Sequence, residues 1–387
     1  MSKVCISRRK FLTDATAATG GAGLAATGVD LSAPPHANDI LRVEEWRPDG
    51  RYEPGSLVRT LHGDVLIGDF EEVLSISERY LNDHCLIRHD NEWHLFGITG
   101  FIPSSPTDDS RRAESEISFV HATSADLKNW RLWPDVMRCS RTWPEIGHVY
   151  APYVMERQGV YYMLYAATDE DTTQRICLAT SRDLFQWDRY SGNPVIVPSL
   201  FWSRWPRFGI DAPDGQSTYG GCRDACIIQL PDGRYVAYWV SRLQNRFGEN
   251  LCCVAASLST DLVHWQEVGP VLSVKAWFQP LTLEAESPCV VFKDGSYWMF
   301  FKHGWWTHVA RSNSPFDFLG SPLIRLGYSH ASKVFFWQEN WWITHCKTYP
   351  DDFSQQRSNR LKGLYLGKLQ WPEGGYPRFA QRLSSSN

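Results

Sequence analysis

The stretch that decides the fold is residues 223–239, which read RDACIIQLPDGRYVAYW. A polar pair opens the stretch, and an apolar run, an Asp-Gly pair and an aromatic-rich run follow in that order. An Asp-Gly pair between two apolar runs is typical of a β-hairpin, because both residues tolerate the backbone angles of a tight turn. The stretch therefore predicts two antiparallel strands joined at Asp232-Gly233.

This pattern occurs five times along the chain. Each copy pairs a short polar opening with a later aromatic run: Asn82-Asp83 with Trp93, Ala151-Pro152 with Tyr161, Arg223-Asp224 with Tyr235, Glu286-Ser287 with Tyr297, and His330-Ala331 with Trp341. The first aromatic residues are 68, 74, 62 and 44 positions apart, which suits four-stranded blades. The sequence therefore predicts an all-β fold, a five-bladed β-propeller with four-stranded antiparallel blades. A β-sandwich is the alternative.

Composition excludes several classes of protein. Of the 387 residues, 43% are hydrophobic and 21% are charged, so a disordered chain is excluded. The net charge of −4 argues against a nucleic-acid partner, which requires a basic face. There is no GxGxxG after a strand and no P-loop, so no redox or nucleotide cofactor is expected. Beyond the N-terminal segment, no stretch is long and apolar enough to predict a membrane span.

The first 37 residues read as an export signal rather than as part of the fold. Residues 7–12 read SRRKFL, a twin-arginine pattern, and an Ala/Gly-rich stretch covers residues 15–26. Cleavage after Ala37 would leave residues 38–387 as a single propeller domain. The sequence therefore predicts a twin-arginine signal peptide over residues 1–37 and a folded protein in the periplasm or the medium. A basic tail is the alternative.

The polar openings are expected to meet at one end of the propeller axis, because the first strand of each blade lines the central channel. At that place the five copies carry Asp83, Ala151-Pro152, Asp224, Glu286 and His330. Clustered carboxylates repel one another and lose hydration, a cost usually tolerated for chemistry or for a cation. A carboxylic acid and a carboxylate that flank a glycosidic bond can hydrolyse it. Turn or cap residues at blade edges are the alternative.

Several of these motifs resemble those of the five-bladed glycoside hydrolases of families 43, 62, 32, 68 and 117. The family 32 motifs NDPNG…YHLFY, RDP and ECP are matched by Asn82-Asp83 with His94-Leu95-Phe96, by Arg223-Asp224 and by Glu286-Ser287-Pro288. The family 43 motifs WAP and GHxS are matched loosely by Tyr150-Ala151-Pro152 and by His330-Ala331-Ser332. His84 and Ala225 stand where these motifs usually have a proline after the acid. The C-terminal β-sandwich domain of family 32 enzymes is not expected here. The predicted architecture is therefore closest to that of family 43.

The resemblance implies a role for each axial acid. Asp83 matches the base of inverting family 43 enzymes, or the nucleophile of retaining family 32 enzymes. Asp224 matches the residue that stabilises the transition state and also sets the pKa of the general acid. Glu286 matches the general acid, and Glu284, two residues earlier on the same strand face, is the alternative.

Further residues are expected around these acids. The candidates for substrate binding are Arg223, Trp143, His303, Trp305 and Trp306. His330 matches the axial histidine that borders a structural calcium in some family 43 members, and a hydrogen-bonded core histidine is the alternative. Family 117 is thought to use a histidine acid, for which His303 or His148 would be the candidates.

The sequence thus predicts an exported glycosidase. Its partner is expected to be an oligosaccharide or polysaccharide with a furanoside or pentoside linkage, such as arabinosyl, xylosyl or fructosyl. No cofactor is required beyond the Ca²⁺ that could lie on the axis. A transglycosylase of the same fold and a non-catalytic carbohydrate-binding propeller are the alternatives, and the oligomeric state is left open.

Overall fold

The computed structural model describes residues 43–45, 56–60, 63–102, 110–169, 173–205, 221–248, 251–275, 285–304, 306–346 and 363–380. The signal peptide over residues 1–37, Glu284 and Trp305 lie outside the described residues, so what the sequence predicts for them stays a prediction. Two short 3-10 helices are described, η1 (Arg112–Glu114) and η3 (Asn245–Phe247). No helix in the described part of the chain is long and apolar enough to cross a membrane.

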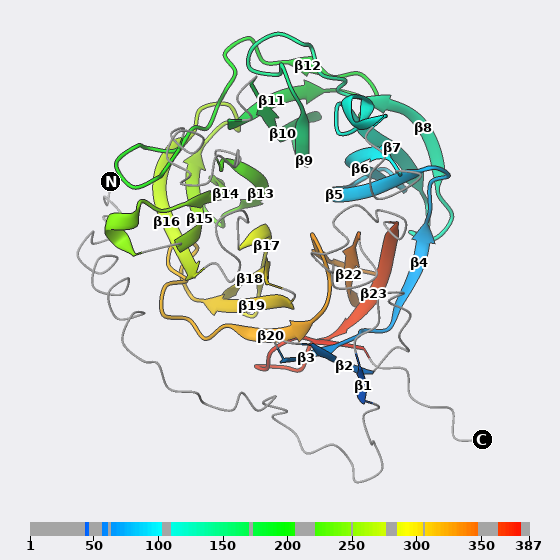
Figure 1. Cartoon of the computed structure of the whole chain (residues 1–387), viewed down its shortest axis with the longest axis vertical. Helices are drawn as coiled ribbons and strands as arrows, with labels where there is room; N and C mark the ends of the chain where they lie inside the picture. The colour runs from blue at the N-terminus through cyan, green and yellow to red at the C-terminus, as the bar shows by residue number, and fades with distance from the viewer. Residues whose placement is uncertain are drawn as a thin grey trace.

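Five antiparallel sheets surround a central axis, as the blades of a propeller do (Figure 1). The all-β, five-bladed propeller predicted from the repeat is confirmed. Blade 1 consists of β5 (Arg79–His89), β6 (Glu92–Phe101), β7 (Phe119–Ser124) and β8 (Arg131–Val136). Blade 2 consists of β9 (Val149–Arg157), β10 (Val160–Thr168), β11 (Gln174–Ser181) and β12 (Asp188–Arg189). Blade 3 consists of β13 (Arg223–Gln229), β14 (Tyr235–Arg242), β15 (Leu251–Ser259) and β16 (Gln266–Lys275).

The last two blades follow the same plan. Blade 4 consists of β17 (Glu286–Lys293), β18 (Ser296–His303), β19 (Trp306–Ser312) and β20 (Ile324–Gly327). Blade 5 consists of β21 (Lys333–Trp337), β22 (Asn340–His345), β23 (Leu364–Gln370) and the two-residue β24 (Arg378–Phe379), with β4 (Phe70–Leu74) added. A separate small sheet contains β1 (Val43–Glu45), β2 (Leu57–Thr60) and β3 (Gly63–Leu66).

Tight turns join the first two strands of each blade where the sequence predicts them. At Gln158-Gly159 the φ angles are 54° and 74°, and at Asp294-Gly295 they are 51° and 73°. Positive φ at both central residues matches the right-handed twist of the flanking strands, which favours Gly in this place. The turn residues therefore fix the hairpin register and with it the face that each side chain occupies.

The ring closes through non-covalent strand pairing. β4, which precedes the first blade, pairs with β23 of the last blade, with Phe70 opposite Gly367 and Glu71 opposite Leu366. A Cβ at Gly367 would lie 2.6 Å from the Phe70 ring, so the close approach of the two strands requires glycine there. The first and last parts of the propeller thus share one sheet, which closes the ring of blades.

Candidate active site

A bulge near the start of the inner strand re-aims the axial residues. The pairing register shifts between Asn82 and His84 in β5, between Arg223 and Cys226 in β13, and between Glu286 and Cys289 in β17. β-bulges bend the strand and redirect a side chain, and they are common beside active sites. The bulge therefore turns the polar opening of the strand toward the axis.

The five openings can be aligned as four-residue units. These units are Asn82-Asp83-His84-Cys85, Tyr150-Ala151-Pro152-Tyr153, Arg223-Asp224-Ala225-Cys226, Glu286-Ser287-Pro288-Cys289 and His330-Ala331-Ser332-Lys333. In four of them the second residue has a positive φ: 44° at Ala151, 59° at Asp224, 51° at Ser287 and 53° at Ala331. The prediction that Glu286 and His330 occupy the same place as Asp83 and Asp224 is wrong by one residue. Because β13 and β17 carry the same bulge, Glu286 holds the place of Arg223 rather than that of Asp224.

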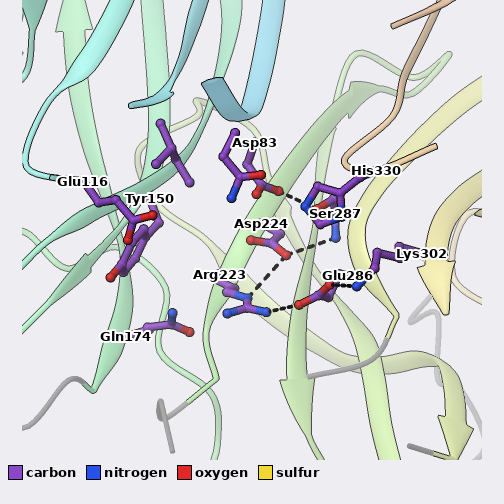
Figure 2. A pocket seen from close by; sticks show the side chains of 12 residues that line it. Asp83, Glu116, Tyr150, Gln174, Arg223, Asp224, Glu286, Ser287, Lys302 and His330 are labelled. Carbon is purple, nitrogen blue, oxygen red and sulfur yellow. Dashed lines mark hydrogen bonds and ion pairs between the residues drawn. The ribbon is translucent and has the colours of Figure 1, made fainter. Parts of the chain in front are cut away.

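The openings surround a pocket of about 260 Å³ at the axis (Figure 2). Its lining residues are Asn82, Asp83, Ile98, Glu116, Tyr150, Gln174, Arg223, Asp224, Glu286, Ser287, Lys302 and His330. The three acids predicted from the repeat thus come together although they are far apart in the chain. Arg223 and His330, predicted as substrate-binding and as an axial histidine, line the same pocket.

Two cations hold the Glu286 carboxylate. Arg223 donates from Nη2 to Oε1 at 2.5 Å, and Lys302 donates from Nζ to Oε2 at 2.7 Å. Charge-assisted hydrogen bonds of this length are stronger than neutral ones, and both favour the ionised carboxylate. The two contacts therefore fix the orientation of the Glu286 carboxylate.

Ser287 links the two aspartates. Its backbone N–H donates to Asp224 Oδ2 at 3.0 Å, and its hydroxyl donates to Asp83 Oδ1 at 2.5 Å. Arg223 Nε lies 3.4 Å from Asp224 Oδ2. These contacts fix both carboxyl groups relative to Glu286, the neighbour of Ser287 in sequence, as Figure 2 shows.

Asp224 is the axial acid most suited to holding a proton. Its side chain is buried, with 6% of the residue exposed. Burial raises the pKa of Asp224 to about 7, and the charges of Asp83 and Glu286 add to the rise while Arg223 opposes it. Asp224 and Asp83 therefore differ in environment, and paired carboxyl groups with different environments are typical of acid/base sites.

Removing the Asp224 charge should change the pH dependence of stability. The pKa of Asp224 is about 7 in the folded chain and about 3.9 in an unfolded one, so its contribution is fully present below pH 4 and is lost as the pH rises through 7. Asp224→Asn should raise the melting temperature at pH 8 by about 5 °C but have little effect at pH 4. Differential scanning calorimetry across this range would measure the effect. Equal shifts at both pH values would contradict the assignment.

The wall formed by blades 1 and 2 is also polar. Tyr80 donates its hydroxyl to Glu116 Oε1 at 2.7 Å. Gln174 is 1% exposed, and its backbone carbonyl accepts a hydrogen bond from the Trp205 indole at 2.8 Å. Among the described residues its Oε1 has no hydrogen-bond partner. The amide of Gln174, together with Glu116 and Tyr150, therefore offers polar atoms to a ligand that enters the pocket.

Several residues predicted to bind substrate do not line this pocket. Trp143 is 57% exposed, and its ring lies 5.9 Å from the Arg175 guanidinium. His303 and Trp306 are buried in blade 4, at 7% and 1% exposure. His148, an alternative acid, stacks on Tyr150 with ring centroids 5.6 Å apart. Substrate binding by these side chains stays a prediction, without support from the pocket geometry.

Four lining residues were missed by reasoning from the sequence: Ile98, Glu116, Gln174 and Lys302. Lys302 lies opposite Glu286 in the β17–β18 hairpin, so counting back from the turn would have found it, had the bulge been recognised. Glu116 and Gln174 belong to no repeated motif. Glu116 adopts a φ of 62°, a conformation that tertiary packing imposes, and no sequence signal predicts it.

Neither a metal cluster nor a disulfide is found within the described ranges. No group of three or more His, Cys, Asp or Glu side chains there could hold a metal ion, so calcium near His330 stays a prediction. All nine described cysteines are buried and free. Most of them were expected to pack as small apolar side chains, and they do.

Comparison with known proteins agrees with the propeller and its first motif. The family described as "Glycosyl hydrolases family 32 N-terminal domain" matches residues 75–203, which include Asp83 and blades 1 and 2. The vacuolar acid beta-fructofuranosidase 1 of a Rosa hybrid cultivar is 32% identical over 87 residues, which cover 21% of this chain and 15% of the rose protein. The chain thus spans only a small part of this curated relative.

Solved structures share the fold over most of the chain. Fructan 1-exohydrolase IIa from Cichorium intybus has a TM-score of 0.58 at 18% identity, and the match covers 79% of this chain and 59% of that one. A thermostable family 43 glycoside hydrolase has a TM-score of 0.54 at 16% identity, covering 80% and 96%. The chain thus shares the five-bladed β-propeller fold of these glycoside hydrolases, and its residues 75–203 match the N-terminal domain of family 32.

Proposed function

We propose that this chain hydrolyses the glycosidic bond of a furanoside or pentoside, such as an arabinosyl, xylosyl or fructosyl sugar. The observation that carries the proposal is the convergence of Asp83, Asp224 and Glu286 from blades 1, 3 and 4 in one pocket. The names of the relatives support the substrate class, because they include a fructofuranosidase and a fructan exohydrolase. The polar wall of Glu116, Tyr150 and Gln174 suits a ligand rich in hydroxyl groups.

Asp83 attacks the anomeric carbon or activates water in this proposal. The Ser287 hydroxyl holds Oδ1, which leaves Oδ2 for the reaction. In the first case a glycosyl-enzyme ester forms as the leaving group departs, and water then hydrolyses it. In the second case a water molecule, deprotonated by Asp83, displaces the leaving group in one step. Asp224, in the ionised form that it adopts above its pKa of about 7, stabilises the positive charge that develops on the sugar ring.

Glu286 protonates the departing oxygen. Arg223 and Lys302 both favour the ionised form of Glu286, so substrate must loosen at least one of these contacts before Glu286 can hold a proton. In this proposal the Lys302 contact loosens, while Arg223, which also approaches Asp224, keeps its place. Binding of the correct sugar thereby prepares the acid.

Removing the Lys302 charge should therefore shift the pH profile. Lys302→Met makes protonation of Glu286 easier, so the basic limb of kcat/KM should move to higher pH by about one unit. The control is Lys368→Met, because Lys368 is exposed on β23, far from the axis in the blade plan. A basic limb that stays in place in Lys302→Met would contradict this role of the ion pair.

A substrate panel tests the proposal. Nitrophenyl α-L-arabinofuranoside and β-D-xyloside, sucrose, inulin and arabinan would be incubated with the wild-type protein, and the products separated by chromatography. Release of one monosaccharide identifies the sugar. Longer oligosaccharides among the products would indicate a transglycosylase instead. Binding without turnover would indicate a carbohydrate-binding propeller and overturn the proposal.

A further inference from the structure

The pocket wall formed by blades 1 and 2 contains a buried acceptor that lacks a donor. Gln174 is the first residue of β11 in blade 2, and only 1% of it is exposed. It lines the pocket, yet its Oε1 has no hydrogen-bond partner in the part of the chain that the structure describes. A buried polar atom without a partner costs stability, so its presence requires an explanation. A donor supplied by a ligand in the pocket is the explanation that the position of the amide favours.

Contacts outside the pocket fix the backbone that carries this amide. Gln174 pairs with Thr168 of β10, and its backbone carbonyl accepts a hydrogen bond from the Trp205 indole at 2.8 Å. The next residue, Arg175, forms an ion pair with Asp169 at 2.6 Å. The start of β11 is therefore held on both sides of the strand. An acceptor that is already in position binds a ligand with little loss of conformational freedom.

Glu116 offers a second acceptor on the same wall. Its Oε1 accepts the hydrogen bond from Tyr80 at 2.7 Å, which leaves Oε2 for a ligand. Figure 2 shows the Glu116 and Gln174 side chains on one side of the pocket, away from Glu286. Carboxylate and amide oxygens accept hydrogen bonds and cannot donate them. This wall is therefore suited to hydroxyl groups, which can donate, and unsuited to a carboxylate.

The order of the blades indicates which part of the substrate reaches Gln174. In the proposed reaction Glu286 of blade 4 protonates the departing oxygen, so the leaving group must lie beside blade 4. Blade 3, which carries Asp224, separates blade 4 from the blade of Gln174 in the ring (Figure 1). The part of the substrate that meets Gln174 is then the glycosyl unit, which is the sugar that carries the anomeric carbon.

We propose that Gln174 is a substrate-binding residue that selects the glycosyl unit, because its Oε1 accepts a hydrogen bond from one hydroxyl group of that sugar. The inference rests on the proposed function, since it assigns Gln174 a part in recognising the substrate of that reaction. A sugar without this hydroxyl group leaves the buried acceptor unpaired again and is rejected. Gln174 thereby determines specificity without taking part in the proton transfers.

The kinetic test compares Gln174→Met with the wild type on the panel glycoside of highest kcat/KM and on its monodeoxy derivatives. Met has a similar size and removes the amide oxygen, so kcat/KM on the intact substrate should fall about 30-fold. One deoxy derivative should cost the wild type a similar factor but cost the variant nothing further, because the contact is already absent. The loss should be the same for dinitrophenyl and alkyl leaving groups. Gln174→Leu is the second variant in case Gln174→Met does not fold.

The matched control is Gln186→Met, in the exposed turn that follows β11 at the other end of the same strand. It should keep the wild-type kinetics on every derivative. If each deoxy derivative costs the Gln174 variant as much as it costs the wild type, the amide contacts no hydroxyl group of the sugar and the proposal is overturned.

A second measurement does not depend on turnover. Because Met removes the unpaired acceptor, Gln174→Met without sugar should melt about 2 °C higher than the wild type. Arabinose, xylose and fructose would then be added separately, and the one that binds should raise the melting temperature of the wild type much more than that of the variant. Equal shifts in both proteins, or no shift in the wild type with any of the three, would overturn the proposal. A shift that depends on Gln174 without turnover of any panel sugar would reject the proposed function and keep Gln174 as a sugar-binding residue.

Discussion

Replacing Asp83 with Asn is expected to lower kcat by a factor on the order of 10⁴, with the fold intact. The amide has nearly the same shape as the carboxylate and can still accept the Ser287 hydroxyl. It can neither attack the anomeric carbon nor deprotonate water, so the loss should fall on kcat rather than on KM. Initial rates on the best panel substrate, with the melting temperature measured alongside, would separate catalysis from folding.

A matched control uses an acid of a surface turn. Asp126 accepts hydrogen bonds from the backbone N–H groups of Lys128 and Asn129, at 2.9 and 2.8 Å, in an exposed turn after β7. Asp126→Asn should leave kcat unchanged.

Addition of azide to Asp83→Gly should restore part of the activity, because the small anion fills the space of the carboxylate. More than a tenth of the wild-type rate in Asp83→Asn would reject Asp83 as base or nucleophile.

Glu286→Gln should cause the second large loss, and its size should depend on the leaving group. For an unactivated sugar or alcohol, kcat/KM should fall about 10³-fold, because nothing protonates the departing oxygen. For a dinitrophenyl glycoside, whose leaving group needs no proton, the loss should be much smaller. A plot of log kcat/KM against leaving-group pKa measures this difference as a steeper slope.

The control for Glu286 is Glu339→Gln, at the exposed turn before β22. It should give the wild-type slope. Equal losses for activated and unactivated substrates in Glu286→Gln would mean that this residue is not the general acid. In that case the proton would have to come from Asp224, the axial acid whose pKa is raised to about 7.

Most of the fold could be predicted because the turn residues of each hairpin agree with the fivefold repeat along the chain. Asp294-Gly295 adopts the positive φ angles that its sequence predicts, and the hairpins that flank such turns recur at blade length. The contribution of β4 to the last blade was not foreseen. Residues 70–74 belong to no repeat copy, and their pairing with β23 depends on the closure of the whole ring.

The site was predictable only where the repeat marks it. Asp83 and Asp224 hold the second position of their four-residue units, but Glu286 holds the first, just before the bulge at Ser287. That bulge also places Lys302 opposite Glu286. Trp306 illustrates the converse error, since an aromatic residue near a blade end can face the core as readily as a ligand. Whether a side chain faces the pocket depends on local register, and hydrophobic pattern does not encode a one-residue shift.

One rate comparison tests the central claim that the axial carboxylates cleave a glycosidic bond. Wild type and Asp83→Asn, at equal concentration and with matching melting temperatures, would be incubated with the substrate panel and the released sugar quantified. The account predicts turnover of a furanoside or pentoside by the wild type and a loss of about four orders of magnitude in the variant. Equal turnover by both proteins, or no turnover of any panel sugar by the folded wild type, would contradict it.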